Sequence, residues 1–105
     1  MDAEKQQRLE AAGWRVGTVA EFLDLTPEES ALVEIRTALA RSLRERRRER
    51  MTQAELAAKI QSSQPRVAMA EQGDDSVSIE LLIRAMLATG ATPREIGYVI
   101  AAVGA

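Results

Sequence analysis

The sequence predicts an all-α fold, and three observations carry the prediction. Alanine and leucine dominate the apolar residues, whereas the chain of 105 residues holds one Trp, one Tyr and one Phe. Apolar residues recur at helical spacing. Several of the periodic segments begin with a Ser or Thr that can cap a helix. From residue 26 onward these signals predict five helices.

Residues 1–25 are predicted to form an N-terminal extension with a short helix over residues 3–12 and a capping box at 18–21. The extension is too apolar for a free tail, because it carries Trp14, Val16, Val19, Phe22, Leu23 and Leu25. Two interpretations are open. These side chains pack on the long helix that follows, or they form a docking surface for a second protein.

The main domain is expected over residues 26–105 and opens with a long helix. Thr26 is a favourable cap, Pro27 occupies the first helical position, and Glu29 lies three residues after the cap. The helix is expected to continue to about Arg48. Its apolar residues at helical spacing are Leu32, Ile35, Leu39 and Leu43.

Two short helices, separated by a gap that fits only a sharp turn, are predicted over residues 52–73. Thr52 and Glu55 form a capping box at the first helix, whose pattern stops at Gln61. Ser63 caps the second helix, and a Gly ends it. Such a pair is a helix-turn-helix, an arrangement that points to DNA.

Two further helices complete the domain. Ser78 caps a helix that Gly90 ends, and Thr92 opens a last helix. The last helix is apolar over a wide face, with Ile96, Val99, Ile100 and Val103. This face either closes the core of its own domain or forms the seam of a homodimer, in which two recognition helices would lie about 34 Å apart on DNA.

The second short helix carries the candidate base-reading residues. Gln64 and Arg66 lie in its first two turns, where such helices point at bases. An amide can bond bidentately to adenine and a guanidinium to guanine, each worth about 1–3 kcal/mol of discrimination. Met69 could touch a thymine methyl group. The alternative is a small helical bundle in which Gln64 and Arg66 simply face water.

The formal net charge of −2 is unevenly distributed along the chain. Residues 1–34 carry −5, residues 35–66 carry +6 and residues 67–105 carry −3. Positive charge is therefore concentrated in and just before the helix pair, as neutralisation of DNA phosphates requires. The run LRERRRER at 43–50 is either a solvated face with pairs four residues apart or a set of arginines that reach the DNA backbone.

Several classes of function are excluded by composition. The chain holds no Cys and no His, so disulfides, thiolate metal sites, catalytic triads and histidine-based acid–base chemistry are absent. The Asp74 and Asp75 carboxylates beside a Gly are interpreted as a loop, and we expect no enzyme, metal or cofactor. No segment resembles a signal peptide or approaches membrane-spanning length, so a cytoplasmic protein without membrane contact is expected.

The helix pair resembles the XRE/Cro-type helix-turn-helix regulators, which include the lambdoid phage repressors and the antitoxins of the host-inhibition-of-growth type. The matching features are Thr-Gln-Ala-Glu-Leu-Ala at 52–57, Ser-Gln at 63–64, Val67 and Glu-Gln-Gly at 71–73. The similar region spans Leu39 to Gly90, about half of the chain. The predicted fold is thus an all-α, five-helix, lambda-repressor-like helix-turn-helix domain with a short helical N-terminal extension.

The resemblance also implies roles for single residues. Gln53 would cap a DNA phosphate, and Gln64 would contact a base and help to anchor Gln53. Arg66, Ala68 and Met69 would face the groove or its rim. Together with the arginine run, the expected phosphate contacts are Gln53, Ser63, Arg44, Arg47, Arg48 and Arg50.

Two positions depart from the family pattern. Gln61 stands where the family usually has Gly, at a turn position that takes a positive φ. Arg50 runs directly into the next apolar residue, which indicates a shorter loop. The resemblance implies that Glu71 pairs with an arginine of the long helix, and the shorter loop leaves Arg46 and Arg47 as candidates. Both continue the buried edge of that helix, and we favour Arg46.

The sequence therefore predicts a sequence-specific, double-stranded DNA-binding transcription regulator, most simply a repressor that binds a pseudopalindromic operator as a homodimer. The alternative is an antitoxin that neutralises a toxin protein and autoregulates its operon. In that case residues 1–25, which the helix-turn-helix does not explain, are the candidate toxin contact.

Overall fold

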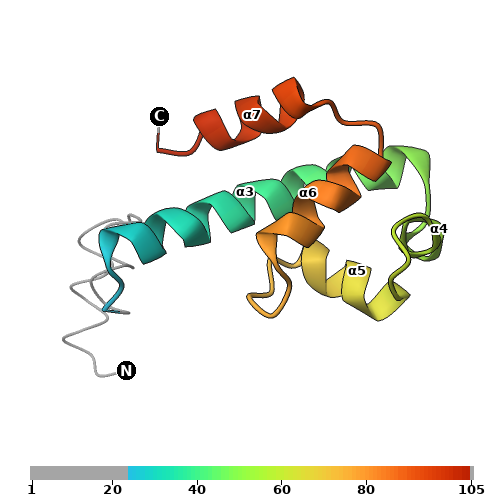
Figure 1. Ribbon diagram of the computed structural model, residues 1–105, viewed down its shortest axis with the longest axis horizontal. Helices are drawn as coiled ribbons and strands as arrows, with labels where there is room; N and C mark the ends of the chain where they lie inside the picture. The colour runs from blue at the N-terminus through green and yellow to red at the C-terminus, as the bar shows by residue number, and fades with distance from the viewer. Residues whose placement is uncertain (1–23, 105) are drawn as a thin grey trace, which may run out of the picture. The chain divides into compact units, whose positions relative to one another are not determined.

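The structure, a computed structural model, describes residues 24–104 and contains five α-helices there (Figure 1). In chain order they are α3 (Pro27–Arg50), α4 (Gln53–Lys59), α5 (Gln64–Glu71), α6 (Ile79–Ala88) and α7 (Pro93–Ala101). The described residues form no strand, so the predicted all-α fold with five helices from residue 26 onward is confirmed. The helix predicted over 3–12 and the capping box at 18–21 lie outside the described residues.

The compact unit that holds the helix pair begins at Val33, within α3. The predicted boundary at residue 26 stays a prediction. Over residues 24–104, no helix combines the length and the apolar character that crossing a membrane requires.

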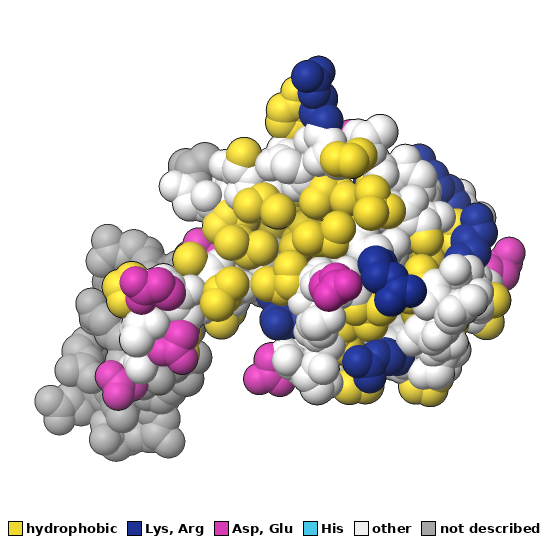
Figure 2. Space-filling model, in the orientation of Figure 1, with side chains coloured by type: hydrophobic (Ala, Val, Ile, Leu, Met, Phe, Trp, Pro, Cys, Tyr) yellow, Lys and Arg dark blue, Asp and Glu magenta, His cyan; other side chains and the backbone are white. Residues whose placement is uncertain are grey.

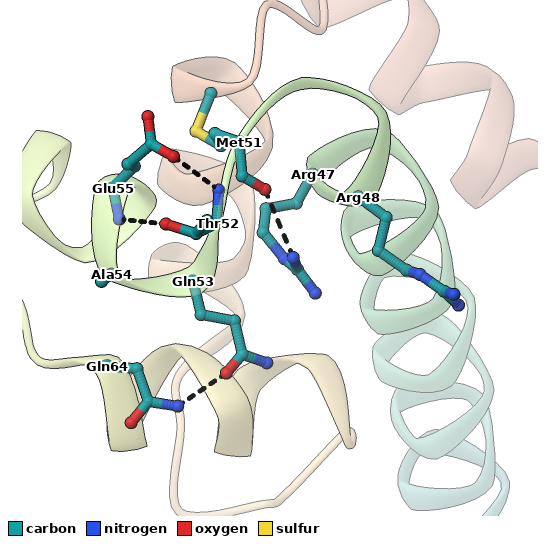
Figure 3. A pocket seen from close by; sticks show the side chains of 8 residues that line it. All are labelled: Arg47, Arg48, Met51, Thr52, Gln53, Ala54, Glu55 and Gln64. Carbon is teal, nitrogen blue, oxygen red and sulfur yellow. Dashed lines mark hydrogen bonds between the residues drawn. The ribbon is translucent and has the colours of Figure 1, made fainter.

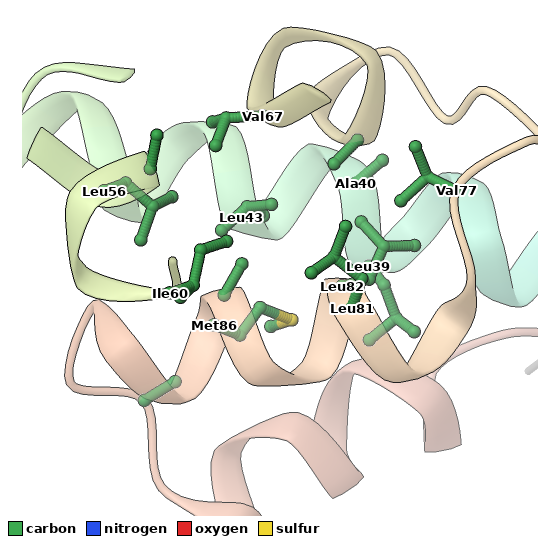
Figure 4. Close-up of a cluster of buried hydrophobic side chains, with 14 of the residues drawn as sticks. Leu39, Ala40, Leu43, Leu56, Ile60, Val67, Val77, Leu81, Leu82 and Met86 are labelled. Carbon is green, nitrogen blue, oxygen red and sulfur yellow. The ribbon is translucent and has the colours of Figure 1, made fainter. Parts of the chain in front are cut away.

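The core lies between α3 and the helices that follow it. The buried residues of α3 are Leu39, Ala40 and Leu43, and Leu82 and Met86 of α6 lie beside them (Figure 4). Each fully buried Leu or Met side chain among them is worth about 1.5–3 kcal/mol relative to an exposed one. The rest of the core ties α4, α5 and α7 to this centre and consists of Leu56, Ala57, Ile60, Val67, Ala70, Val77, Leu81, Ala85, Ala91 and Ile96.

Each of the five helix starts carries the cap that the sequence predicts. Thr26, Thr52 and Thr92 form capping boxes with the Glu three residues further on. Ser63 and Ser78 accept the backbone N–H three residues further on. These bonds satisfy N–H groups that have no partner inside the helix, so local sequence alone places the helix starts.

Three of the helices end in the same left-handed turn, in which backbone N–H groups return to carbonyls of the last turn. Gly73 ends α5 at a φ of 73°, and Gly90 ends α6 at a φ of 98°. The prediction that Gln61 takes the positive φ usually left to Gly is confirmed, because its φ is 55°. The Ser62 N–H donates to Ala57 O at 2.8 Å and closes this turn. A side chain in this conformation costs about 1–2 kcal/mol, so α4 and α5 keep their sharp turn against local strain.

Candidate nucleic-acid interface

The second helix of the pair, α5, buries one face and presents the other. Val67, Ala70 and Glu71 are buried, whereas Gln64 and Arg66 are exposed near its start. Both candidate base-reading side chains are therefore accessible at the N-terminal end of α5, which is the end that helices of this class direct at base edges.

The later residues of α5 differ in accessibility. Ala68 and Met69 are half-buried, and Met69 packs against the core. Gln72, which is not among the site residues predicted from the sequence, is exposed directly after α5. It follows Gln64 by two turns and Ala68 by one, so helical spacing was a signal that could have identified it.

A chain of hydrogen bonds joins the start of α5 to α4 and then to the end of α5. Gln64 Nε2 donates to Gln53 Oε1 at 2.6 Å, as Figure 3 shows, and Gln53 Nε2 donates to Glu71 Oε1 at 3.1 Å. Gln64 thus anchors Gln53, as the family resemblance implies. Each amide nitrogen carries a second N–H that these two bonds do not use.

The chain of hydrogen bonds continues into a buried ion pair between α5 and α3. Arg47 Nε donates to Glu71 Oε2 at 2.6 Å, and Arg47 Nη2 donates to Glu71 Oε1 at 2.9 Å. Arg47 Nη1 also donates to Met51 O at 3.3 Å. The Arg47 and Glu71 side chains are 13% and 3% exposed. The hydrogen bonds to Glu71 raise the pKa of Arg47 above its ordinary value, so the guanidinium group stays protonated.

The expectation that Arg46 pairs with Glu71 is wrong. Arg46 donates instead to Glu95 Oε2 in α7. Successive residues of a helix point about 100° apart, so two adjacent arginines of α3 face different neighbours. The other candidate, Arg47, is the one that faces α5.

The predicted phosphate contacts of α3 fall into two groups. Arg44 and Arg48 are exposed. Arg47 is held in the buried pair, and Arg50 Nη1 donates to Arg46 O at 3.2 Å. Of the four arginines, Arg44 and Arg48 are therefore the freest to meet a ligand.

The remaining predicted phosphate contact, Ser63, is exposed at the start of α5. Its hydroxyl oxygen accepts the backbone N–H of Arg66 at 3.2 Å.

Two further arginines, which the sequence analysis did not single out, hold the ends of the helix pair. Arg84 Nη2 donates at 3.1 Å to the carbonyl oxygen of Ile60, the C-cap residue of α4. Arg36 Nη1 donates to Asp74 O at 3.3 Å and to Val77 O in the loop after α5. These bonds join residues 24 to 41 positions apart, so no local pattern reveals them.

Acid is expected to weaken the capping boxes of α4 and α7. The backbone N–H of Thr52 donates to the Glu55 carboxylate and lowers its pKa. The pKa of Glu95 is lowered in the same way by the backbone N–H of Thr92 and, in addition, by the hydrogen bond from Arg46. Because the folded pKa lies below the ordinary value of about 4.3, protons bind the unfolded state first. The stabilisation is therefore complete above that value and is lost as the pH falls through the folded pKa.

The measurement is urea unfolding across the acid range. We expect the urea concentration at the unfolding midpoint to decrease as the pH is lowered from about 5 to about 3. This decrease should be smaller in the Glu55→Gln/Glu95→Gln variant. An equal fall in that variant would assign the acid sensitivity to other carboxylates.

A short capped helix, a tight turn and a second helix with exposed polar side chains at its start define a class, the helix-turn-helix proteins that bind DNA. A family model described as helix-turn-helix matches residues 41–96, more than half of the chain. The chain belongs to this family of XRE/Cro-type helix-turn-helix proteins, and its lambda-repressor-like fold and DNA binding follow from that membership. Comparisons with curated proteins and with solved structures give no match. The similarity to antitoxins stays a prediction.

Proposed function

We propose that the protein is a sequence-specific, double-stranded DNA-binding transcription regulator that represses by occupying a pseudopalindromic operator as a homodimer. The observation that carries the proposal is the exposed start of α5, where Gln64 and Arg66 are accessible and Gln64 is fixed by its 2.6 Å bond to Gln53. A side chain held in one orientation discriminates between bases better than a mobile one.

The chemistry of the two side chains suits different bases. Gln64 keeps its carbonyl oxygen and its second N–H, which together match the donor and acceptor of adenine in the major groove. Arg66 is exposed, and its planar guanidinium matches the two acceptors of guanine. Ala68 and Met69 offer apolar contact to a thymine methyl group along the same helix.

Phosphate contacts would fix the orientation of α5 in the groove. Gln53 lies at the start of α4, and its second N–H is available to a phosphate oxygen after the bond to Glu71. Ser63 lies at the start of α5 and is exposed. Contacts of this kind set register and affinity but do not distinguish sequences.

Apolar side chains at the surface of α6 and α7 support the homodimer. Leu87 is 44% exposed and Tyr98 is 65% exposed. Figure 2 shows a broad apolar area on the face that it draws. Large apolar areas at a surface mark interaction sites. A second copy of the chain would cover this one and give two recognition helices for two half-sites.

A selection of bound fragments from random double-stranded DNA, combined with sedimentation of the complex, tests the proposal. We expect an inverted repeat whose half-sites lie about 10 base pairs apart, bound by two copies of the chain. Recovery of fragments without any common sequence would refute sequence-specific binding. A single half-site bound by one copy, with monomer alone in free solution, would refute the dimer.

A further inference from the structure

The arginines of α3 divide into those with a protein partner and those without. Arg36, Arg46, Arg47 and Arg50 each donate to a carbonyl or a carboxylate. The three others are exposed, and within residues 24–104 no carboxylate lies within 4.0 Å of their guanidinium groups; they are Arg41, Arg44 and Arg48. Among the seven arginines of α3, these three are therefore the ones whose charge has no partner within the described residues.

The three free arginines share one side of the helix. Arg44 follows Arg41 by three residues and Arg48 follows Arg44 by four, which is the spacing of side chains on one helix face. From Arg41 to Arg48 the row is about 10 Å long. The neighbouring side of α3 faces α5, because Arg47 pairs there with Glu71. This row, here called the arginine ridge, consists of Arg41, Arg44 and Arg48 and thus runs along α3 beside α5.

A hollow of about 380 Å³ lies between this ridge and α5. Arg44, Arg48 and Gln72 line it, together with Gln53, Ala68 and the Arg47–Glu71 pair. Both Glu71 oxygens already accept hydrogen bonds, Oε2 from Arg47 and Oε1 from Arg47 and Gln53. Its charge is matched by Arg47, so the two free guanidinium groups dominate the hollow.

We propose that this hollow holds a phosphodiester group of the DNA backbone, bound by Arg44, Arg48 and the Gln72 amide, and that Arg41 extends the contact along α3. This inference rests on the proposed DNA-binding function and assigns two residues, Arg41 and Gln72, that are not among the phosphate contacts predicted from the sequence and take no part in the hydrogen-bonded chain of α4 and α5. Guanidinium groups beside an amide N–H are donors suited to a phosphate anion. The hollow takes Ala68, Glu71 and Gln72 from the second half of α5 and its end, and Gln64 does not line it, so it suits the backbone and not a base edge.

The salt dependence of binding tests the ridge. The test variant is Arg44→Gln/Arg48→Gln, and the matched control is Lys59→Gln/Arg94→Gln, which removes the same charge from exposed sites away from the hollow. The dissociation constant is measured from low to high salt on a selected operator and on a random duplex. Each lost phosphate contact makes the plot of the logarithm of the dissociation constant against the logarithm of the salt concentration less steep, by about 0.9 in slope.

We expect the test variant to lose about 1–2 units of slope on both duplexes while the ratio of the two affinities stays unchanged. The control is expected to keep the slope of the unmodified protein. Arg41→Gln should lower the slope by up to about 0.9, and Gln72→Ala should weaken both complexes at unchanged slope because the amide is neutral.

Several outcomes would overturn the inference. If the unmodified protein binds its operator but the test variant keeps the full slope, the phosphate site is refuted and the proposed function survives. A change in the ratio of the two affinities would make Arg44 or Arg48 a base contact. Inorganic phosphate that raises the unfolding temperature of the unmodified protein but not of the test variant, with the DNA slope unchanged, would make the hollow a free-anion site. If the unmodified protein binds neither duplex, the proposed function itself fails.

Discussion

Replacing Glu71 by Ala is expected to lower the free energy of unfolding by about 3 kcal/mol. The substitution leaves the Arg47 guanidinium without its carboxylate in a site where only 13% of that side chain is exposed. It also removes the acceptor of the Gln53 amide. The estimate lies at the low end of the range for a broken buried pair, because the exposed part of Arg47 can still reach water. Urea unfolding of the two proteins at neutral pH measures the difference.

Two controls separate the buried charge from lost contacts in general. Arg47→Met/Glu71→Leu replaces both charges by apolar side chains of similar volume, and we expect it to recover most of the stability that Glu71→Ala loses. Arg46→Ala removes the neighbouring arginine, whose partner Glu95 is 46% exposed, and should cost far less. If Arg46→Ala and Glu71→Ala were equally destabilising, the assignment of the buried pair to Arg47 would be contradicted.

The helix boundaries could be predicted from the sequence because the signals that set them are local. Thr52 and Glu55 lie three residues apart, and the cap they form depends on little outside that turn. The family resemblance likewise places Gln61 at a positive φ, because it stands at the turn position where the family usually has Gly. The same holds for the exposure of Gln64, which follows from its place at the start of a short amphipathic helix.

The partner of Glu71 could not be predicted in this way. Arg46 and Arg47 are both compatible with a buried edge of α3, and the choice depends on the rotation of α3 relative to α5, which residues 24 positions apart determine. The role of Arg84, which donates to the carbonyl of Ile60 directly after α4, has the same origin. Contacts between helices that are distant in sequence decide which arginines of α3 pair with other residues and which stay unpaired. The position of the arginine ridge follows from those contacts.

Replacing Gln64 and Arg66 by Ala together is expected to abolish the preference for the operator while leaving weak binding to any duplex. Each bidentate contact is worth about 1–3 kcal/mol of discrimination, which is roughly 5- to 150-fold in relative affinity. The phosphate contacts that these two side chains do not touch or orient, chiefly those of the arginines of α3, supply the remaining affinity. Anisotropy titrations of operator and random duplexes at one fixed salt concentration measure both quantities.

The single variants distinguish the two roles of Gln64. Arg66→Ala should lower operator affinity alone, whereas Gln64→Ala should also weaken binding to the random duplex, because it releases Gln53 from the bond that orients it. Gln53→Ala removes that anchored amide directly and is expected to weaken both complexes with little change in their ratio. The comparison is decisive because the two glutamines are joined by one hydrogen bond but would touch different parts of the DNA. An unchanged affinity ratio in Gln64→Ala/Arg66→Ala would mean that sequence is read elsewhere on α5 or through the shape of the DNA.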